Sequence, residues 1–202
     1  MVKVVTDKRQ LETVGKMLVC KLEKDTSLEV AYDVENILEI DNVKNFTLEE
    51  EKSIEIDYAG GKTFKKRQSK NGGTFSLEMA NYPDELQEML DGAERDEDVT
   101  IIYRDSDITP SVGFIYELKF DDGSVGYVGA TNVTVNRAGD TAATSEEGVA
   151  YTAITLEGVA DARIYDGIKK LKTKQEGATE ADRAAFIAKV FKNAVKDEGT
   201  EA

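Results

Sequence analysis

The sequence predicts a mainly β fold in which one short helix flanks the strands and a helical arm follows at the C-terminus. Apolar and polar residues alternate with a period of two in several segments, which is typical of strands with one buried face. Only two prolines and no tract rich in serine, proline and glycine interrupt the 202 residues. We therefore expect one domain over residues 1–170 and an arm over residues 171–202.

Seven segments show the apolar patterns of strands, and turn-forming residues bound most of them. They are Lys16–Glu23, Asn45–Tyr58, Gly73–Ala80, Val99–Asp105, Ser111–Phe120, Ser124–Arg137 and Ala150–Asp161. The fifth and sixth form the clearest pair, because alternation runs through both and the sequence Asp-Asp-Gly-Ser separates them. Asp-Gly is preferred in tight hairpin turns, so these two segments are expected to form a β-hairpin.

The second segment, Asn45–Tyr58, has one strongly acidic side. Its apolar side is interrupted by Glu50 and Lys52 and otherwise consists of Phe46, Leu48, Ile54, Ile56 and Tyr58. Its other side consists of Thr47, Glu49, Glu51, Ser53, Glu55 and Asp57. For an isolated strand, the simplest explanation of such a side is a face exposed to water.

A basic segment bounded by glycine pairs follows, with the sequence AGGKTFKKRQSKNGG at residues 59–73. It is longer than most hairpin loops, and long loops in compact domains are often functional or mobile. We expect residues 58–73 to form a long loop, which is either a flexible basic loop or an arm that docks on an acidic surface. Its candidate docking residues are Lys62, Phe64, Lys65, Lys66, Arg67 and Lys70.

Two helices are predicted. In Asn81–Gly92, Pro83 fits the first helical position, Asp84 and Glu85 favour the positive start of a helix, and Gly92 suits its end. We expect this helix to cover an end or face of the β structure through an apolar stripe, which consists of Leu86, Met89 and Leu90. In Glu180–Val195, apolar residues recur at helical spacing. The sequence leaves open whether this second helix packs on its own domain or on a neighbouring subunit.

Composition limits the classes of function. The chain has 40 Asp and Glu against 26 Lys and Arg, and its net charge of -14 argues against a protein that grips nucleic-acid phosphates over its general surface. It has no histidine, so the commonest general base and zinc ligand is missing and an enzyme is less expected. Cys20 is the only cysteine, which excludes an internal disulfide, favours an intracellular assembly site and predicts a buried, inert thiol.

Known site motifs are also missing from the sequence. Gly60-Gly61-Lys62 is followed by Thr63 but not by a predicted helix, which argues against a phosphate-binding loop. The acidic run over residues 94–107 lacks the ligand spacing and turn glycine of a calcium loop. No apolar run approaches the roughly 20 residues of a membrane span, and the first ten residues lack the apolar core of a signal peptide. We expect a soluble, unexported chain without cofactor, metal or membrane span.

The order of three stretches then points to a family. They are SLEMANYPDELQEMLDG, TPSVGFIYELKFDDGSVGYVGATNV and AYTAITLEGVADAR, which follow the acidic strand and the glycine-bounded loop. In this order they resemble the major tail proteins, or tail tube proteins, of long-tailed, non-contractile bacteriophages. The resemblance covers roughly Gly15–Tyr165, and the stretch AAFIAKVFKNAV is similar to the closing helical stretch of that family.

The resemblance implies a β-sandwich or barrel subunit that assembles with itself into hexameric rings, which stack into a hollow tube. Viral DNA passes through such a tube without specific binding. The family's long loop reaches the adjacent ring, and this role maps onto Tyr58–Gly73. The resemblance further implies other tail proteins as partners (tape measure, tail tip and terminator), assembly in the host cytoplasm and a final place in the virion.

The acidic strand gains a role in this setting. If Asn45–Tyr58 and Gly73–Ala80 line the bore, their apolar side chains, Phe75, Leu77 and Met79 among them, pack against the subunit body. The expected lumen-facing residues are Glu49, Glu51, Glu55, Asp57 and Glu78. A ring repeats these carboxylates once per subunit, and the resulting negative wall repels phosphates where the duplex passes within roughly 8 Å.

Three alternatives stay open at this point. A tube protein of a contractile or defective phage particle shares the chemistry and differs in having a sheath around it. An acidic binding module with a basic recognition loop stays monomeric at any concentration. A glycoside hydrolase needs a pair of carboxyl groups, which any acidic protein supplies as candidates.

Overall fold

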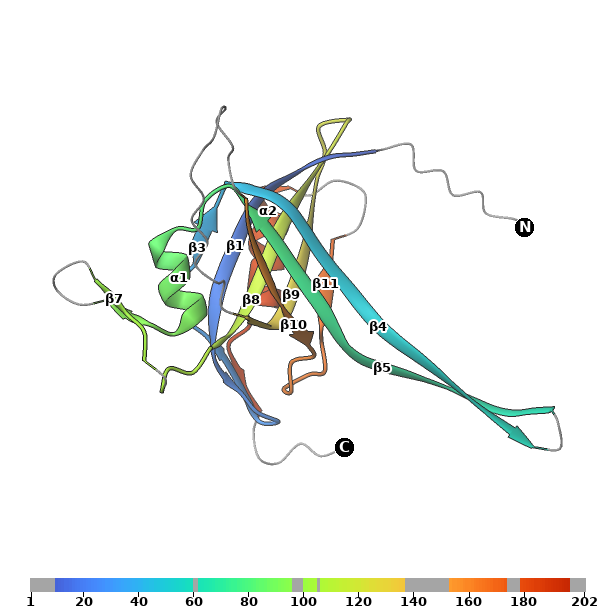
Figure 1. Cartoon of the computed structure of the whole chain (residues 1–202). Coiled ribbons are helices and arrows are strands. Elements are labelled where there is room, and N and C mark those ends of the chain that lie inside the picture. The colour runs from blue at the N-terminus through green and yellow to red at the C-terminus, as the bar shows by residue number, and fades with distance from the viewer. Residues whose placement is uncertain are drawn as a thin grey trace, which may run out of the picture.

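The computed structural model describes residues 10–59, 62–95, 100–104, 106–136, 153–173 and 179–196, and gives only the backbone for residues 51–59, 62–71, 94 and 95. Strands dominate it, which confirms the predicted mainly β class (Figure 1). The elements are β1 Leu11–Asp25, β2 Glu29–Tyr32, β3 Leu38–Ile40, β4 Val43–Ala59, β5 Lys62–Met79, α1 Asp84–Asp91, β6 Glu94–Arg95, β7 Ile101–Ile102, β8 Ser111–Phe120, β9 Val125–Val135, β10 Ile154–Asp161, β11 Lys170–Lys172, α2 Glu180–Val190 and β12 Ala194–Val195.

One antiparallel sheet holds most of these strands. Its order is β12-β2-β1-β8-β9-β10-β5-β4, with β3 paired to β1 and β11 paired to β9. β6 and β7 form a separate two-stranded sheet beside α1 (Figure 1). The short strands β2, β3, β11 and β12 were missed in the sequence because runs of two to four residues carry too little alternation.

The sheet folds back on itself, so that strands distant in its order pack face to face. The ring of Phe46 on β4 lies 3.9 Å from that of Tyr116 on β8, centroid to centroid. The ring of Phe75 on β5 stacks on Phe114 of β8 at 4.6 Å. β4 is the fourth strand away from β8 in the sheet, so these contacts bridge two layers. The predicted sandwich-like arrangement is therefore present.

A first hydrophobic core lies between these layers. It combines alternate residues of β1, β5, β8, β9 and β10 with Leu86 and Leu90 of α1. α1 ends at Gly92, whose φ of 66° is left-handed and suits glycine. Pro83 is the residue before the first helical turn and not within it, one position earlier than predicted. α1 thus covers one side of the β structure, as its apolar stripe indicated.

A second hydrophobic core lies on the other face of β1, β8 and β9, under α2. Phe186 and Val190 of α2 are buried there beside Tyr127. Thr179 begins the helix with a capping box shared with Asp182. Gly129 lies under the helix so closely that a Cβ on it would be 2.5 Å from Val190 Cγ2. The helix therefore packs on its own domain, which settles the question that the sequence left open.

The predicted hairpin over residues 111–137 is confirmed as β8 and β9. Gly123 in its turn has a φ of 78°, and the backbone N–H of Ser124 donates to Asp122 Oδ1 at 2.8 Å. The pairing has a register shift between Val112 and Phe114. Of the predicted strand Val99–Asp105, only β7 is a strand among the described residues.

The close approach of α2 to β9 predicts that Gly129→Ala destabilises the fold. The added methyl group overlaps Val190, a short branched side chain in the core, and overpacking of this kind costs about 1–3 kcal/mol. Thr134→Ala, on the exposed side of the same strand, is the matched control. Urea unfolding measures both, and an unchanged midpoint for Gly129→Ala would contradict the tight packing.

Candidate functional site

Strands β4, β5 and β10 and the end of β9 present one exposed polar face. Register places Phe46, Leu77 and Leu156 side by side on the core face, so their sequence neighbours lie on the opposite face. These neighbours are exposed or partly exposed. We call this surface the open face, and it consists of Asn45, Thr47, Glu49, Thr74, Ser76, Glu78, Asn132, Thr134, Asn136, Thr155, Glu157, Val159 and Asp161.

The carboxylates of the open face are spaced apart. Glu49 is opposite Thr74, and Glu157 is opposite Ser76. Glu78 lies between Asn45 and Thr155, and Asp161 is opposite Asn132. No two carboxylates of this face are register partners, so direct repulsion between opposite like charges is avoided. The face is negative and also rich in hydroxyl and amide groups.

Of the four carboxylates on the open face, two are among the residues predicted to face a lumen and two were missed. Glu49 and Glu78 lie on it, as the alternation of their strands indicated. Glu157 and Asp161 also lie there, because β10 pairs with β5. The alternation of Leu156, Gly158 and Ala160 inward gave the signal for them. This alternation does not reveal the two residues as part of the open face, because the sequence alone does not show that β10 is the neighbour of β5.

Glu51, Glu55 and Asp57 lie farther along β4, beyond the body of the sheet. β10 accompanies β5 only over Gly73–Met79, so residues 62–72 of β5 pair with β4 alone. About nine residues per strand thus project as a two-stranded ribbon roughly 30 Å long (Figure 1). The side chains of these three residues lie outside what the structure describes, and their lumen-facing role stays a prediction.

The prediction of a long loop over residues 58–73 is wrong. β5 begins at Lys62, only two residues after β4 ends at Ala59, and Lys62, Lys65, Lys66, Arg67 and Lys70 all lie within the strand. Only two residues separate the two strands, whereas a loop of about fifteen residues was expected. Glycines 60 and 61 therefore connect two strands, whereas the sequence interpretation took them as the start of a loop.

The register of this hairpin sets basic against acidic positions. Lys65 is opposite Asp57, and Arg67 is opposite Glu55. Phe64 falls at a register shift, where β5 has one residue more than β4. A second shift lies between Glu50 and Lys52, where β5 contributes the extra residue beside Gly72 and Gly73. This second shift marks the point at which the hairpin leaves the body.

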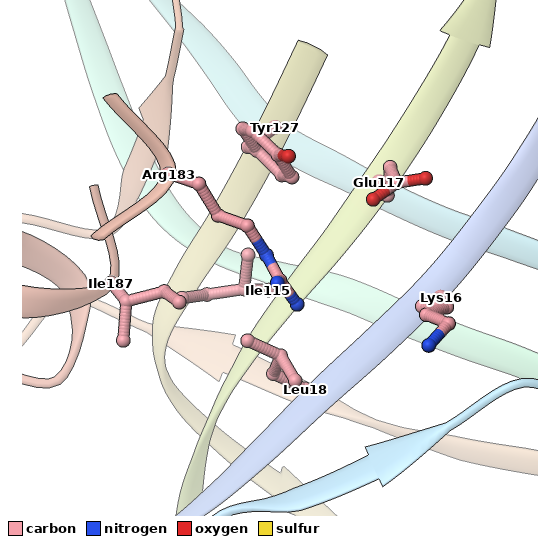
Figure 2. Close-up of a pocket in the computed structure, with 7 residues that line it drawn as sticks. All are labelled: Lys16, Leu18, Ile115, Glu117, Tyr127, Arg183 and Ile187. Carbon is pink, nitrogen blue, oxygen red and sulfur yellow. The ribbon is translucent and has the colours of Figure 1, made fainter. Parts of the chain in front are cut away.

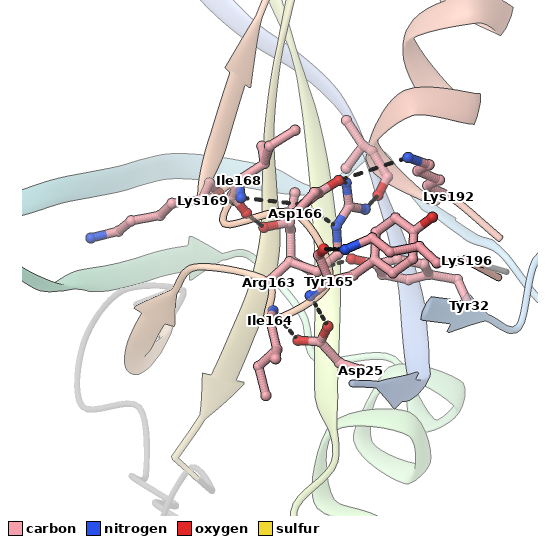
Figure 3. A network of polar contacts seen from close by, with 12 residues as sticks. Asp25, Tyr32, Arg163, Ile164, Tyr165, Asp166, Ile168, Lys169, Lys192 and Lys196 are labelled. Atoms are coloured by element: carbon pink, nitrogen blue, oxygen red, sulfur yellow. Dashed lines mark hydrogen bonds and ion pairs between the residues drawn. The ribbon is translucent and has the colours of Figure 1, made fainter. Parts of the chain in front are cut away.

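A buried ion pair holds the turn that follows β10 (Figure 3). Arg163, whose side chain is fully buried, donates from Nε and Nη2 to the two oxygens of Asp166 at 3.0 and 2.7 Å. Its Nη1 donates to the Val190 carbonyl at the end of α2 at 2.8 Å. Burial disfavours ionised Asp166, but the hydrogen bonds from Arg163 and from the Ile168 N–H outweigh this and lower the pKa of Asp166.

Asp25 fastens the same turn to the end of β1. Its carboxylate accepts the backbone N–H groups of Ile164 at 2.8 Å and Tyr165 at 3.0 Å. Beneath the turn, Tyr32 donates its hydroxyl to the Thr131 carbonyl at 2.5 Å, and burial raises the pKa of this tyrosine to about 12. The turn over residues 162–169 is therefore held from three elements, β1, α2 and β9.

The C-terminal segment completes this network. Lys196 donates from Nζ to the carbonyls of Tyr165 at 2.7 Å and Ser27 at 3.0 Å. The ammonium groups of Lys192 and Lys196 lie 4.7 and 4.5 Å from the centre of the Tyr165 ring (Figure 3). β12 pairs with β2, so the segment after α2 is part of the sheet.

At its other end α2 is tied to β1 and β3. Glu39 pairs with Lys16 of β1 and also with Arg183 of α2, the latter at 3.1 Å. Figure 2 shows Arg183 extending from α2 across Ile115 toward β1. The small pocket between them, of about 10 Å³, is about the size of one water molecule, so it offers no room for a larger ligand.

A larger hollow of about 520 Å³ opens at the base of the hairpin. Glu50 and Gly72 line it from the hairpin, and Asp161, Lys169 and Lys170 line it from the β10–β11 region. Among the described residues, no group of three or more His, Cys, Asp or Glu side chains is placed to hold a metal ion. No helix in the described part of the chain is long and apolar enough to cross a membrane.

Comparisons with known proteins give little further identification. No protein-family model matches the chain, and no curated protein matches it. Among solved structures, it is similar to a chain in the cryo-EM structure of the anti-feeding prophage (AFP) baseplate, 6-fold symmetrised, with a TM-score of 0.38 and 11% sequence identity. That match covers 85% of this chain and 97% of the other. At this TM-score, neither fold nor function is carried over from that baseplate.

The buried ion pair predicts that Arg163→Met strongly destabilises the protein. The variant keeps roughly the volume of the side chain but leaves the buried Val190 carbonyl without its side-chain donor and Asp166 without its two hydrogen bonds from the guanidinium, which costs about 1–3 kcal/mol. Lys192→Met removes a more exposed charge from the same region and is the matched control, expected to cost about 1 kcal/mol or less. Urea unfolding with equal midpoints for the two variants would contradict this role of Arg163.

Proposed function

We propose that this chain is the structural subunit of a phage-type tail tube, which assembles with itself into hexameric rings that stack into a conduit for DNA. The observation that carries the proposal is the pair β4–β5. In the body, these strands carry the negative open face, and beyond it they continue as a projecting hairpin. One pair of strands thus joins a surface suited to line a bore with an arm suited to reach another subunit.

The open face suits a conduit because it is acidic and its carboxylates are spaced apart. Glu49, Glu78, Glu157 and Asp161 repeat in every subunit of a ring and form a wall that repels phosphates. Salt screens this repulsion over roughly 8 Å, so it acts where DNA comes close to the wall. A basic bore would instead bind DNA phosphates, with a steep dependence on salt. DNA therefore passes without being held.

The projecting hairpin suits docking because its charge is opposite to that of the body. Residues 51–70 contain six Lys and Arg against three Asp and Glu, whereas the whole chain carries a net charge of -14. The hairpin thus carries a net charge of +3, and the rest of the chain carries a net charge of -17. Docking of this arm on an acidic surface of the next copy is a heterologous contact, which propagates as a filament.

In this proposal the protein is a virion component and not an enzyme, and it needs no cofactor. Assembly takes place in the host cytoplasm with tape-measure, tail-tip and terminator proteins as further partners. A contractile or defective particle would use the same subunit surfaces and add a sheath outside them. The absence of histidine from the sequence supports a structural role over a catalytic one.

Negative-stain electron microscopy and sedimentation velocity of the purified chain at several concentrations test the proposal. Hollow tubes or six-fold rings are expected, alone or after addition of tail-tip complexes as seeds. A particle that remains monomeric at every concentration, with seeds present, would contradict the tube and favour an acidic binding module.

Charge reversal of the hairpin is expected to stop assembly. Lys65→Glu, Lys66→Glu and Arg67→Glu remove the attraction between the arm and the acidic body, while the core of the subunit is untouched. The same reversal at the exposed Lys21, Lys172 and Lys189 is the matched control. Electron microscopy should show tubes for the control alone, and tubes from the hairpin variant would remove the docking role.

Charge reversal of the open face is expected to make the tube retain DNA. The test variant carries Glu49→Lys, Glu157→Lys and Asp161→Lys, and the control carries Glu12→Lys, Glu23→Lys and Glu35→Lys, all at exposed positions. Assembled tubes are mixed with linear double-stranded DNA and pelleted at several salt concentrations. Co-sedimentation that falls steeply with salt is expected for the test variant only. Equal retention by both variants would place the open face outside the bore.

A further inference from the structure

The hairpin β4–β5 joins the body at a bulge. Between the pairs Glu50–Gly73 and Lys52–Lys70, β5 contains one residue more than β4. β10 stops accompanying β5 at Gly73, so the ribbon beyond this point is held to the body by its own two strands. Bulges bend and twist a strand pair, and the direction of the ribbon is therefore set at this joint.

Gly73 is the closest-packed position of the joint. A Cβ on it would lie 2.4 Å from the Glu49 carbonyl oxygen, 2.8 Å from Lys169 Nζ and 3.0 Å from Lys169 Cε. The Cε–Nζ end of the Lys169 side chain therefore occupies the space that a side chain at position 73 would need. Figure 3 shows Lys169 extending from the turn toward the β4 and β5 ribbons.

The base of Lys169 is fixed. Its backbone carbonyl accepts the N–H of Thr131 at 3.1 Å, and the turn before it is held by the Arg163–Asp166 pair and by Asp25. A side chain that reaches from this anchored turn into the joint can resist bending of the ribbon. The hollow of about 520 Å³, lined by Glu50, Gly72 and Lys169, provides space into which the joint can bend when the side chain is removed.

We propose that Lys169 is a positioning residue, whose Cε–Nζ end packs over Gly73 and sets the direction in which the β4–β5 hairpin leaves the body. The Arg163 network then acts on the hairpin through Lys169. The consequence for assembly rests on the proposed function, because a misdirected hairpin misses the next copy. The direction itself is a property of the isolated subunit and is measured without assembly.

Pulsed electron paramagnetic resonance between two nitroxide labels measures the direction. The labels are attached at Gln68→Cys on the hairpin and Lys189→Cys on α2. Cys20 stays unlabelled, because it is fully buried and burial raises the pKa of its thiol to about 12. Because the free ribbon is roughly 30 Å long, a swing of about 15° moves its tip by about 8 Å, which is well resolved.

Lys169→Ala is expected to shift or broaden the distance distribution, and Lys169→Met is expected to retain the wild-type distribution because it keeps an atom at the position of Cε. Lys170→Ala, at the exposed neighbouring lysine that also lines the hollow, is the matched control and should leave the distances unchanged. A wild-type distribution for Lys169→Ala, or a shift for Lys169→Met equal to that for Lys169→Ala, would overturn the proposal.

Electron microscopy of the same variants separates this inference from the proposed function. Shifted distances together with loss of tubes support both. Shifted distances with normal tubes support the positioning role of Lys169 and contradict docking through the hairpin. Unchanged distances with loss of tubes overturn the positioning role and leave the proposed function standing.

Discussion

Burial of β1, β8 and β9 on both faces determines where every other element lies. Alternate residues of β1 enter different cores, with Met17 and Val19 under the folded-back sheet and Leu18 and Cys20 under α2. Because apolar surface on both sides of these strands must leave water, the sheet has to fold over one side and the helix has to cover the other. Strands β10, β5 and β4 have one core face only, and their second face forms most of the open face.

The open face and the hairpin are therefore connected, because β4 and β5 contribute to both. β4 and β5 cover the first core with Phe46, Leu48, Phe75, Leu77 and Met79. Beyond Gly73, β5 pairs with β4 alone among the described strands. The bulge with its two glycines falls at this boundary and separates a rigid, core-bound half from a projecting, basic half.

Polar contacts hold the opposite side of the molecule together. Arg163, Asp166 and Asp25 connect the turn after β10 to β1 and to the end of α2, and Lys196 connects the C-terminal strand to the same turn. A buried guanidinium is costly unless its donors are used, and here Nε, Nη1 and Nη2 each find an acceptor. The result is a fixed base beside the joint of the hairpin, from which Lys169 extends.

The sequence by itself determined what depends on neighbouring residues. Alternation and Asp-Gly gave the β8–β9 hairpin, cap residues gave α1, and the acidic sides of β4 and β5 gave Glu49 and Glu78. Tertiary structure decided which segments pair and pack with one another. Lys62–Lys70 form a strand because β4 supplies hydrogen-bond partners for a polar segment that lacks an apolar pattern of its own. Glu157 and Asp161 join the open face through pairing of β10 with β5, and Arg163 meets Val190 because α2 docks over β9. The alternation within each of these segments shows which of its residues face inward, but it does not identify the segment that lies beside it, because each partner supplies only half of the contact.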